Sequence, residues 1–497
     1  MRTDIAYAPL MPWVLRALVS ALWWLCACAS SRNSDDVSTR GEVRIRVVDA
    51  ASGQPVRCKL LLTAAGETLA VGPPGPAGKW IAAHVLANDL AVYGDPCDLT
   101  LRLPARPLQL QASAGIEWEL ARAWVTPDPA LLSRVELKLE RALDTTGFAC
   151  VDLHVHSAPS FDSDVPLDQR IVSALAEGLD AIAPTDHEAV ADWDGELARL
   201  HLADALTLLL GMEVTPDIWP SPQALGHFGV FPVPQTLDAS QHQSGFHTPG
   251  SLLSRLDELY PDSLIQVNHP RWANIGYFNV SAFDPRDPSL DERLGLSHLD
   301  AIELWNSNQL NLSGSAELEL MLEDFFTLLE LGFPLVATGN SDTHDLSRQP
   351  LGYPRNCVRV ANDRHPGLTP DDLAEGLRLG RVFVTSGPWL EVSLAGRGPG
   401  ELVELERDAL LEISVDAASW VSVDRVRIVV NGRTVSTLAT PSLPAHFQAP
   451  LELSGGVSYI MVIAEGDAPL PSVAGELAAP QPSFAFTNPL WVRISSE

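Results

Sequence analysis

Four apolar runs in the middle of the chain end in histidines and acids, and this recurrence constrains the fold more than any other feature. The runs are residues 151–157 (VDLHVHS), 182–187 (IAPTDH), 264–269 (LIQVNH) and 335–344 (LVATGNSDTH). Each begins as a short apolar segment of the kind that forms a buried strand. Helix-like segments separate them, so the pattern predicts repeated β-α units with polar residues at the ends of strands.

The first run carries two histidines, His154 and His156, separated by one residue. A strand would place both imidazoles on the same face, because alternate side chains point the same way. Two acids, Asp162 and Asp164, follow in the next loop. A single histidine after a strand is usually a packed or capping residue, but four such endings in order indicate a metal site.

The order of these motifs, HxH, TDH, NHP and GNSDTH, resembles that of the polymerase and histidinol phosphatase (PHP) metallohydrolases. The flanking residues resemble the carbaryl-hydrolase-like branch of that superfamily. The resemblance covers roughly residues 147–390. It implies an α/β fold in which this region forms a distorted (β/α)7 TIM-like barrel, with its site at the carboxyl ends of the strands.

The resemblance also implies two or three divalent metal ions per chain, Zn, Mn or Fe, bound by imidazoles and carboxylates. The predicted metal ligands are His154, His156, Asp162, His187, Glu213, His227, His269, Asp342 and His344. They divide into three groups, with Glu213 bridging the first two: His154, His156 and Asp342; Glu213, His227 and His269; and Asp162, His187 and His344. Relatives commonly place the loop acid where Phe161 stands, so Asp162 is preferred and Asp164 stays an alternative.

Hydrolysis near neutral pH needs an activated water, and a bound divalent metal lowers the pKa of water from about 16 toward 7. The predicted catalytic residues are Asp342, His344 and Arg271. Arg271 either meets an anionic group of the substrate or forms a surface ion pair. Asn306 is a candidate pocket residue, and Asp186 is expected to face the other side of its strand and to orient a ligand.

The acidity of the chain limits its partners. It has 497 residues and a formal net charge of −30. This balance argues against a nucleic-acid polymer, because nucleic-acid binding relies on basic patches that neutralise phosphates. A small phosphate ester remains compatible, since bound metals offset its charge. The expected partner is therefore a small-molecule substrate.

The N-terminus is predicted to be a lipoprotein signal peptide, residues 1–28. Two arginines precede an apolar run, residues 17–25, which is too short for a confident membrane span. The sequence LCAC that ends the segment resembles a bacterial lipobox with Cys28 as the lipidated residue, and an ordinary cleaved signal peptide is the alternative. The mature chain is then expected to be exported and anchored to a membrane of the bacterial envelope, in the periplasm or at the outer membrane.

Composition and periodicity divide the rest of the chain. Residues 29–40 are small and polar, as in a flexible tether. Residues 41–146 are predicted to form a β-sandwich resembling carboxypeptidase regulatory-like domains, 147–390 the PHP domain, and 391–497 an Ig-like β-sandwich. Residues 232–250 are polar, and are either a lid over the site or a surface insertion.

Four cysteines lie outside the predicted signal peptide. An exported compartment permits disulfides, and Cys58–Cys97 is the expected pair because both residues fall in one predicted domain. Cys150 and Cys357 lie beside predicted strands and are expected to be simply buried. No pair has the C-x-x-C spacing of a zinc ribbon or a redox motif.

The sequence therefore predicts an exported metal-dependent hydrolase that uses a multinuclear metal centre to activate water against a small phosphoester. The alternative is a carbamate, ester or amide hydrolase with the same metal ligands, which the ligands alone do not distinguish. A third reading, from another class, is a non-catalytic surface-binding lipoprotein. A degenerate site should have lost ligands, and the predicted ligand set is complete.

Overall fold

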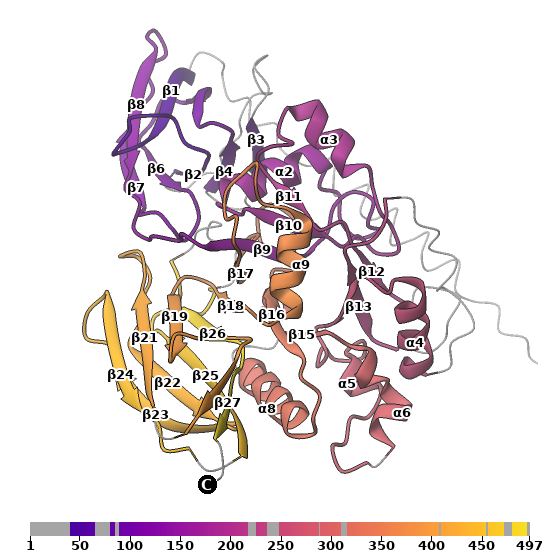
Figure 1. Cartoon of the computed structure of the whole chain (residues 1–497). Coiled ribbons are helices and arrows are strands. Elements are labelled where there is room, and N and C mark those ends of the chain that lie inside the picture. Colours follow the sequence, from indigo (N-terminus) through magenta and orange to yellow (C-terminus); the bar gives the residue numbers. More distant parts are fainter. Residues whose placement is uncertain are drawn as a thin grey trace, which may run out of the picture.

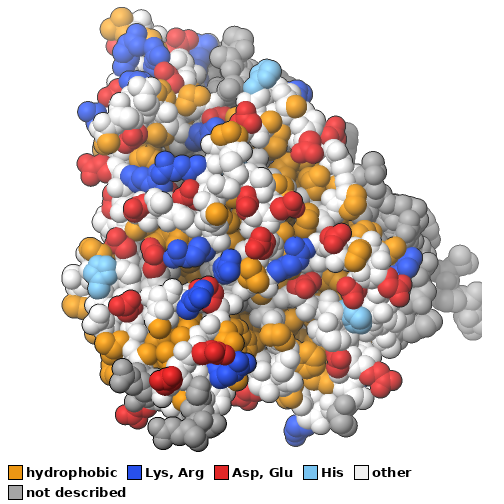
Figure 2. All heavy atoms as spheres, viewed as in Figure 1, with side chains coloured by type: hydrophobic (Ala, Val, Ile, Leu, Met, Phe, Trp, Pro, Cys, Tyr) orange, Lys and Arg blue, Asp and Glu red, His pale blue; other side chains and the backbone are white. Residues whose placement is uncertain are grey.

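The computed structural model describes residues 40–64, 80–84, 89–216, 225–235, 248–287, 289–309, 316–406, 409–453, 456–471 and 480–494. Three predicted segments lie wholly or partly outside these ranges: the signal peptide with Cys28, all but the last residue of the tether, and residues 236–247 of the segment predicted to be either a lid or a surface insertion. Within them, no helix combines the length and the apolar character needed to cross a bilayer. The fold is mixed α/β, and Figure 2 shows acidic, basic and apolar side chains interspersed over one face.

The N-terminal region consists of two β-sheets around one apolar core. The strands are β1 (Arg40–Asp49), β2 (Cys58–Thr63), β3 (Trp80–His84), β4 (Asp89–Gly94), β5 (Asp98–Pro104), β6 (Leu108–Ser113), β7 (Ala121–Val125) and β8 (Ser133–Leu139). One sheet has the order β5-β1-β8 and the other β3-β4-β2-β6-β7. Val43, Ile45 and Val47 of β1 are buried because alternate side chains of a strand face the core. The Cys58–Cys97 disulfide is present, which confirms that prediction.

The central region carries strands and helices in alternation. Its strands are β9 (Phe148–Val155), β10 (Ala181–Pro184), β11 (Thr207–Leu208), β12 (Met212–Val214), β13 (His227–Phe231), β14 (Leu264–Asn268), β15 (Ala301–Asn306) and β16 (Val336–Asn340). Its helices are α2 (Leu167–Ala176), α3 (Trp193–Leu200), α4 (Pro249–Leu259), α5 (Tyr277–Val280), α6 (Leu290–Leu294), the 3-10 helix η4 (Leu296–His298), α8 (Ala316–Glu330) and α9 (Pro370–Arg378). Figure 1 places these elements beside the N-terminal sheets and along the right of the view.

The central strands belong to two sheets. β9, β10 and β11 are neighbours in one sheet, and β12 to β16 form the other in sequence order. β14, β15 and β16 run parallel, whereas β12 and β13 pair antiparallel with their neighbours. Isolated bridges join the two sheets: Val155 pairs with Thr343 beyond β16, and His187 pairs with Glu213 of β12. Both bridges lie beside predicted ligands, and closure of the strands into a barrel stays a prediction.

Local sequence fixes the ends of two helices. Thr248 and Thr369 each accept a hydrogen bond from the backbone N–H three residues later and are followed by proline. This capping box satisfies backbone donors that the first turn of a helix leaves unpaired. α4 and α9 therefore start where the sequence provides both a cap and a proline.

The C-terminal region continues the central sheet. Its strands are β17 (Arg355–Arg359), β18 (Val382–Thr385), β19 (Trp389–Leu394), β20 (Leu402–Leu405), β21 (Leu410–Asp416), β22 (Arg425–Val430), β23 (Arg433–Ala439), β24 (Ala445–Pro450), β25 (Gly456–Glu465), β26 (Phe484–Thr487) and β27 (Leu490–Ile494). One sheet runs in the order β11-β10-β9-β17-β18-β26-β25-β22-β23, and β19-β21-β24 form a separate sheet that shares its core. The predicted boundary at residue 390 therefore coincides with no break in the larger sheet.

A second disulfide joins Cys150 to Cys357. The expectation that these two cysteines are simply buried is therefore wrong. The reason is β17, an antiparallel neighbour of β9 that the sequence pattern does not reveal. Its register places Cys357 directly opposite Cys150.

The N-terminal sheets also touch the central region near the predicted site. Lys59 of β2 and Glu177 at the end of α2 form an ion pair, and both side chains are fully buried. Tyr93 of β4 donates a hydrogen bond from its hydroxyl to the Leu346 carbonyl at 2.9 Å. Leu346 lies two residues beyond His344, so this contact holds the loop that follows a predicted ligand.

Candidate metal centre

All nine predicted metal ligands lie together in the central region. They form four overlapping groups, in each of which the ligand atoms lie within 4.8 Å of one another. The groups are His154, His156 and Asp342; His154, Glu213 and His269; His187, Glu213 and His227; and His156, Asp162, His187 and His344. The first matches a predicted group, and the last is a predicted group with His156 added. Such clusters could hold metal ions, and the assignment of each residue as a ligand stays a prediction.

Glu213 occupies the centre of the cluster. Its Oε1 lies 3.3 Å from His269 Nε2 and 3.3 Å from His227 Nδ1. Its Oε2 lies 3.0 Å from His187 Nδ1 and 3.5 Å from His156 Nε2. Because its two oxygens face different imidazoles, this carboxylate is placed to bridge two positions.

Asp342 lies against the histidine pair of β9. Its Oδ1 is 3.2 Å from His154 Nε2 and 3.2 Å from His156 Nε2. Its Oδ2 accepts a hydrogen bond from the Asn306 amide at 3.1 Å. The strand therefore presents both imidazoles to one carboxylate, as their spacing predicts, and Asn306 lies in the site.

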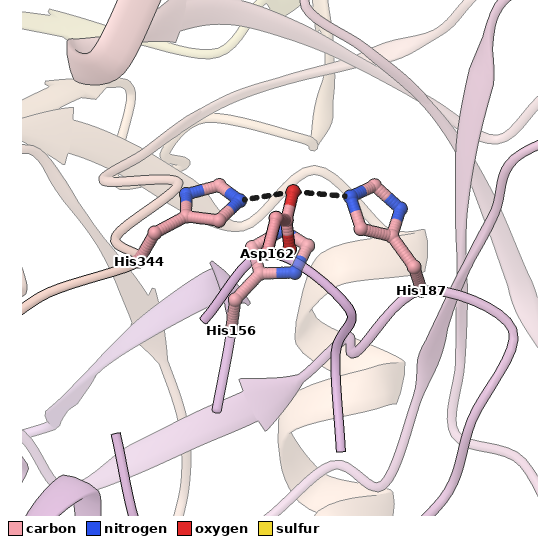
Figure 3. A group of neighbouring side chains, drawn as sticks. All are labelled: His156, Asp162, His187 and His344. Atoms are coloured by element: carbon pink, nitrogen blue, oxygen red, sulfur yellow. Dashed lines mark hydrogen bonds and ion pairs between the residues drawn. The ribbon is translucent and has the colours of Figure 1, made fainter. Parts of the chain in front are cut away.

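Asp162 lies between His187 and His344, and Figure 3 shows its carboxylate reaching both rings. Its Oδ2 is 3.1 Å from His187 Nε2 and 3.2 Å from His344 Nε2. Its side chain is 32% exposed, whereas the side chains of His154 and His156 are inaccessible. Asp164 is exposed and belongs to none of the described clusters. The loop therefore brings Asp162 to the site, and Asp162 forms its solvent-facing side.

Glu303 of β15 is a site residue that the sequence reasoning missed. Its Oε1 lies 3.0 Å from His154 Nδ1, and its Oε2 accepts the His269 backbone N–H at 2.7 Å. Asn306 and Asn340 also donate to it. A carboxylate on the far nitrogen of an imidazole fixes the ring and points the other nitrogen inward. The available signal was one acid inside the apolar run AIELWN.

Hydroxyl and amide groups hold four of the candidate ligands. The Ser160 hydroxyl lies 3.1 Å from His156 Nδ1 and donates to Asp162 Oδ1 at 2.8 Å. The Thr215 hydroxyl lies 2.6 Å from His187 Nδ1. The Asn268 amide donates to Glu213 Oε1 at 3.0 Å. Each contact orients a ring or a carboxylate that the sequence alone leaves free to rotate.

The backbone is strained at two candidate ligands. His269 has φ 28° and Asp342 has φ 51°, in the left-handed region that only a few per cent of residues other than glycine adopt. Such a conformation costs of order 1–3 kcal/mol and persists only when the surroundings enforce it. Both residues follow strands, β14 and β16, and the turn aims their side chains into the cluster.

Burial and neighbouring charges shift the pKa values of the groups in the cluster in different directions. Burial opposes ionisation of the acids, but facing imidazoles hold the pKa of Asp342 and Glu213 well below the usual range of carboxyl groups. Burial likewise lowers the pKa of His187, yet Glu213 and Asp162 raise it to about 10. Burial and the neighbouring His344 lower the pKa of His156 to about 3. The acids are thus charged at neutral pH, and His156 is a neutral imidazole.

The donor set fits divalent metal ions. Every candidate atom is an imidazole nitrogen or a carboxylate oxygen, and none is a thiolate, which suits Zn, Mn or Fe. His156 Nε2 is buried and makes no hydrogen bond with any described residue, although Asp342 lies 3.2 Å away. A coordination bond would satisfy this nitrogen. The residues present therefore fit a metal centre.

Two further predicted residues are placed by their contacts. Arg271 forms a two-point ion pair with Asp324, at 2.6 and 2.8 Å, and it is in none of the clusters described. The structure thus shows Arg271 in an ion pair, but a largely buried one rather than one on the surface, and a contact with substrate stays a prediction. Asp186 is buried and accepts hydrogen bonds from the Ser157 backbone and hydroxyl. It orders the start of the Ser157 loop rather than joining a cluster.

Two aromatic rings border the cluster. Phe161 is exposed and stacks on His187, with ring centroids 4.6 Å apart. Trp272 meets His269 edge to face at 5.1 Å. Each ring thus packs against one candidate ligand at the edge of the cluster.

Comparison with known proteins leaves the family open. No family model matches the chain, and no curated protein matches it. Among solved structures, a lesion-specific endonuclease, PfuEndoQ, from Pyrococcus furiosus is 17% identical over 46% of this chain and 56% of its own, with a TM-score of 0.32. A β-glucuronidase from Bacteroides uniformis is 10% identical over 89% of this chain and 58% of its own, with a TM-score of 0.18. The chain thus covers less than two thirds of either protein, and neither likeness carries an argument.

Proposed function

We propose that this protein is a metal-dependent hydrolase whose multinuclear centre activates water against a small phosphoester. The observation that carries the proposal is that several imidazoles share the carboxylate of Glu213, whose two oxygens lie within 3.5 Å of different rings. A purely structural ion pair needs one imidazole per carboxylate, whereas a bridging ligand needs both oxygens to face separate positions. The motif order that resembles PHP metallohydrolases supports the same reading.

The three predicted positions for an ion are kept in this proposal. His154, His156 and Asp342, which form one of the described groups, would hold the first ion. Glu213, His227 and His269 would hold the second, because Glu213 Oε1 lies 3.3 Å from each imidazole, although the described groups place His269 with His154 and His227 with His187. Asp162, His187 and His344 would form the third, on the solvent-facing side. Bound divalent ions would supply an activated water and stabilise negative charge in the transition state.

The protein's own groups position the reaction. Glu303 and Ser160 hold the rings of His154 and His156, so the two Nε2 atoms converge on Asp342. Asp342, which faces both Nε2 atoms, would accept a proton from the attacking water, and the partly exposed His344 would protonate the leaving group. Both residues are thus proposed as catalytic groups as well as ligands.

We propose that the central strands close into a distorted seven-stranded barrel of the PHP type. The support is the ring that the pairings trace: β9-β10, the His187–Glu213 bridge, β12 to β16, and the Thr343–Val155 bridge back to β9. The candidate ligands follow the carboxyl ends of these strands or begin the next one, as in barrel enzymes. The β-sandwiches flanking it on both sides are part of the same proposal.

A carbamate, ester or amide hydrolase is the second candidate, and one contact favours it. The guanidinium of Arg271 is held by Asp324, so the arginine predicted to meet an anionic substrate group is committed elsewhere. The polar groups beside Asp342 are instead the neutral amides of Asn306 and Asn308. A neutral substrate needs no cation for recognition.

The test compares two substrates on one preparation. The protein is loaded with Mn or Zn, and its turnover of an aryl phosphate is measured against that of the corresponding aryl carbamate. His154→Ala serves as the blank for contaminating hydrolases. Faster phosphate turnover supports the first candidate, and faster carbamate turnover replaces it with the second. Less than one bound ion per chain with no turnover of either would support a non-catalytic lipoprotein instead.

We also propose that the protein is exported and held in the bacterial envelope by a lipid on Cys28. The two disulfides support export, because disulfides persist in oxidising compartments and are rare in the cytosol. Mass spectrometry of the N-terminal peptide tests the proposal. A diacylglyceryl group on Cys28 is expected, and an unmodified residue or an intact signal peptide would refute it.

A further inference from the structure

One end of the N-terminal region exposes three large apolar side chains. Trp124 is 70% exposed, Leu131 68% and Leu132 41%. Trp124 lies on β7, the edge strand of its sheet, and the two leucines lie in the connection from β7 to β8. We call this group, Trp124, Leu131 and Leu132, the β7–β8 tip. Single exposed hydrophobic residues are common on proteins, but a tryptophan and two adjacent leucines at one end form a patch.

The described chain begins at the same end. Val43 of β1 is in register with Ser133, the residue that directly follows Leu132. The backbone of Gly41 passes so close to Asp128 of the β7–β8 connection that a Cβ on Gly41 would lie 2.3 Å from its carbonyl. Arg40, the first residue of β1, is twelve positions after Cys28. An extended chain of that length reaches at most about 40 Å, so Cys28 lies within that distance of β1.

Arginines surround the tip although the chain as a whole is strongly acidic. Arg40 starts β1, Arg102 lies on the adjacent strand β5, and Arg134 follows the tip on β8. The last two are exposed, and the Arg40 guanidinium reaches the Arg102 carbonyl. Two acids, Glu42 and Asp128, share this end. Figure 2 shows basic and apolar side chains together at the top of the view, where Figure 1 places the upper ends of β1 and β8.

We infer that the β7–β8 tip inserts into the interfacial layer of an anionic lipid bilayer. Tryptophan favours the level of the headgroups, leucines enter the acyl boundary, and arginines pair with lipid phosphates. The inference rests on the proposed lipid at Cys28: the short span from Cys28 to Arg40 would hold the tip close to the bilayer, which favours a bilayer over another protein as its partner. A single lipid-modified residue would leave the body free to rotate about its tether, whereas a second contact at the tip would fix which way the metal centre faces.

The test places a fluorophore at the tip of the full-length protein. Leu131→Cys is labelled with an environment-sensitive dye and reconstituted into vesicles of phosphatidylethanolamine and phosphatidylglycerol. The four cysteines in the described part of the chain form two disulfides, so they do not compete for the dye. Cys26 is removed with the proposed signal peptide and Cys28 carries the proposed lipid, so the processed protein offers no other thiol. Val435→Cys on β23, where the native side chain is 57% exposed against 68% for Leu131, is the control in the C-terminal region.

The expected result is a blue-shifted emission at position 131 that lipids carrying a quencher suppress, with neither effect at position 435. Replacing phosphatidylglycerol by phosphatidylcholine should reduce the quenching about tenfold, because it removes the attraction of the arginines to anionic lipid. Substituting Trp124→Ser and Leu132→Ser together should reduce it about as much, because it removes buried apolar area. Equal responses at the two positions would overturn the inference. A response that disappears when the protein is diluted in lipid would also overturn it, and would assign the tip to a second copy of the chain.

Discussion

Glu303 shows how one buried carboxylate can serve two candidate ligands at once. It contacts the His154 ring through one oxygen and the His269 backbone through the other. It thereby links the histidine pair of β9 to the strained turn after β14. Its role is to position these groups, since it belongs to none of the described ligand clusters.

Glu303→Gln should weaken metal binding by about 10–100-fold, the usual effect of losing a carboxylate behind a ligand histidine. The amide keeps the shape but loses the charge that holds the His154 ring. Metal affinity is measured by competition with a chelator, alongside kcat at saturating metal. Glu258→Gln, on the exposed face of α4, is the control. A lower kcat with unchanged metal affinity would contradict the positioning role.

Asp162 and Asp164 provide a matched pair of substitutions in one loop. Asp162→Asn should remove ions from the outer position and lower turnover by about 100-fold, because a neutral amide oxygen is a far weaker ligand than a carboxylate. Asp164→Asn should stay within threefold of wild type, since its side chain lies outside the described clusters. Metal content per chain and turnover are both measured. The reverse order of effects would move the ligand to Asp164.

The pH dependence of stability should include one residue far from the metal centre. Burial raises the pKa of Asp180 to about 7, although the Cys150 N–H donates to it. A raised carboxyl pKa means that the folded state binds the proton more tightly than the unfolded state. The resulting stability is complete below pH 4 and is lost as pH rises toward 7, by about 1–3 kcal/mol. Asp180→Asn should therefore show a flatter dependence of its unfolding midpoint between pH 4 and pH 7, and an unchanged slope would contradict the assignment.

At the residue scale, the sequence reveals ligands more readily than their supports. Six of the candidate ligands stand in clear motifs, whereas Glu213, His227 and Asp162 carry weaker signals, and all nine come together. Glu303 stands alone in an apolar run, and Ser160 and Thr215 are common loop residues without a spacing signal. Their roles depend on which rings lie opposite them. That information exists only once distant strands are paired.

At the scale of elements, periodicity predicts long, regular segments and misses short or exceptional ones. The apolar run over residues 206–214 resembles one strand but forms two, β11 and β12, in different sheets. β17 escapes prediction because it follows a loop directly and carries a polar start, Arg355 and Asn356. Both side chains are buried and donate hydrogen bonds to other elements: Arg355 donates to the Glu177 carbonyl, and Asn356 donates to the Asn340 side chain. Hydrogen bonds from distant elements satisfy these buried polar side chains, and the local sequence does not reveal such partners.

The disulfide across β9 and β17 should stabilise the strand that presents the histidine pair. Cys150→Ala together with Cys357→Ala should lower the free energy of unfolding by about 2–5 kcal/mol. Thermal unfolding of the variant is compared with that of the wild type, with and without a reductant. Metal affinity at room temperature should stay within threefold, because His154 lies four residues beyond Cys150 at the other end of the strand. A wild-type midpoint that a reductant leaves unchanged would contradict this contribution.

At the scale of the whole molecule, buried polar contacts join regions that the sequence separates. The Lys59–Glu177 pair and the Tyr93–Leu346 hydrogen bond tie the N-terminal sheets to α2 and to the loop after His344. The C-terminal strands extend the sheet that contains β9. Composition predicts distinct segments but carries no information about these joins. The N-terminal region is therefore a support for the site rather than only a spacer.

Lys59→Met should lower the free energy of unfolding by about 3–5 kcal/mol, because it leaves the Glu177 carboxylate buried without its charged partner. The double variant, Lys59→Met with Glu177→Met, should recover most of that loss, since it buries no unpaired charge. Chemical denaturation of the wild type, both single variants and the double variant completes a mutant cycle. Additive losses would mean that the two side chains do not interact.

The candidate ligands are spread along the chain from His154 to His344, on the ends of strands that meet only in the finished fold. In an unfolded chain, His154 and His156 are almost the only candidate ligands close enough together to bind one metal ion. Tight metal uptake must then come last, after the sheets have formed. Imidazole and carboxylate sites discriminate weakly among divalent ions, so local supply decides which ion enters. The ion recovered from a preparation would thus record where the chain completed its folding, and refolding it beside a different metal should yield a differently loaded enzyme from the same sequence.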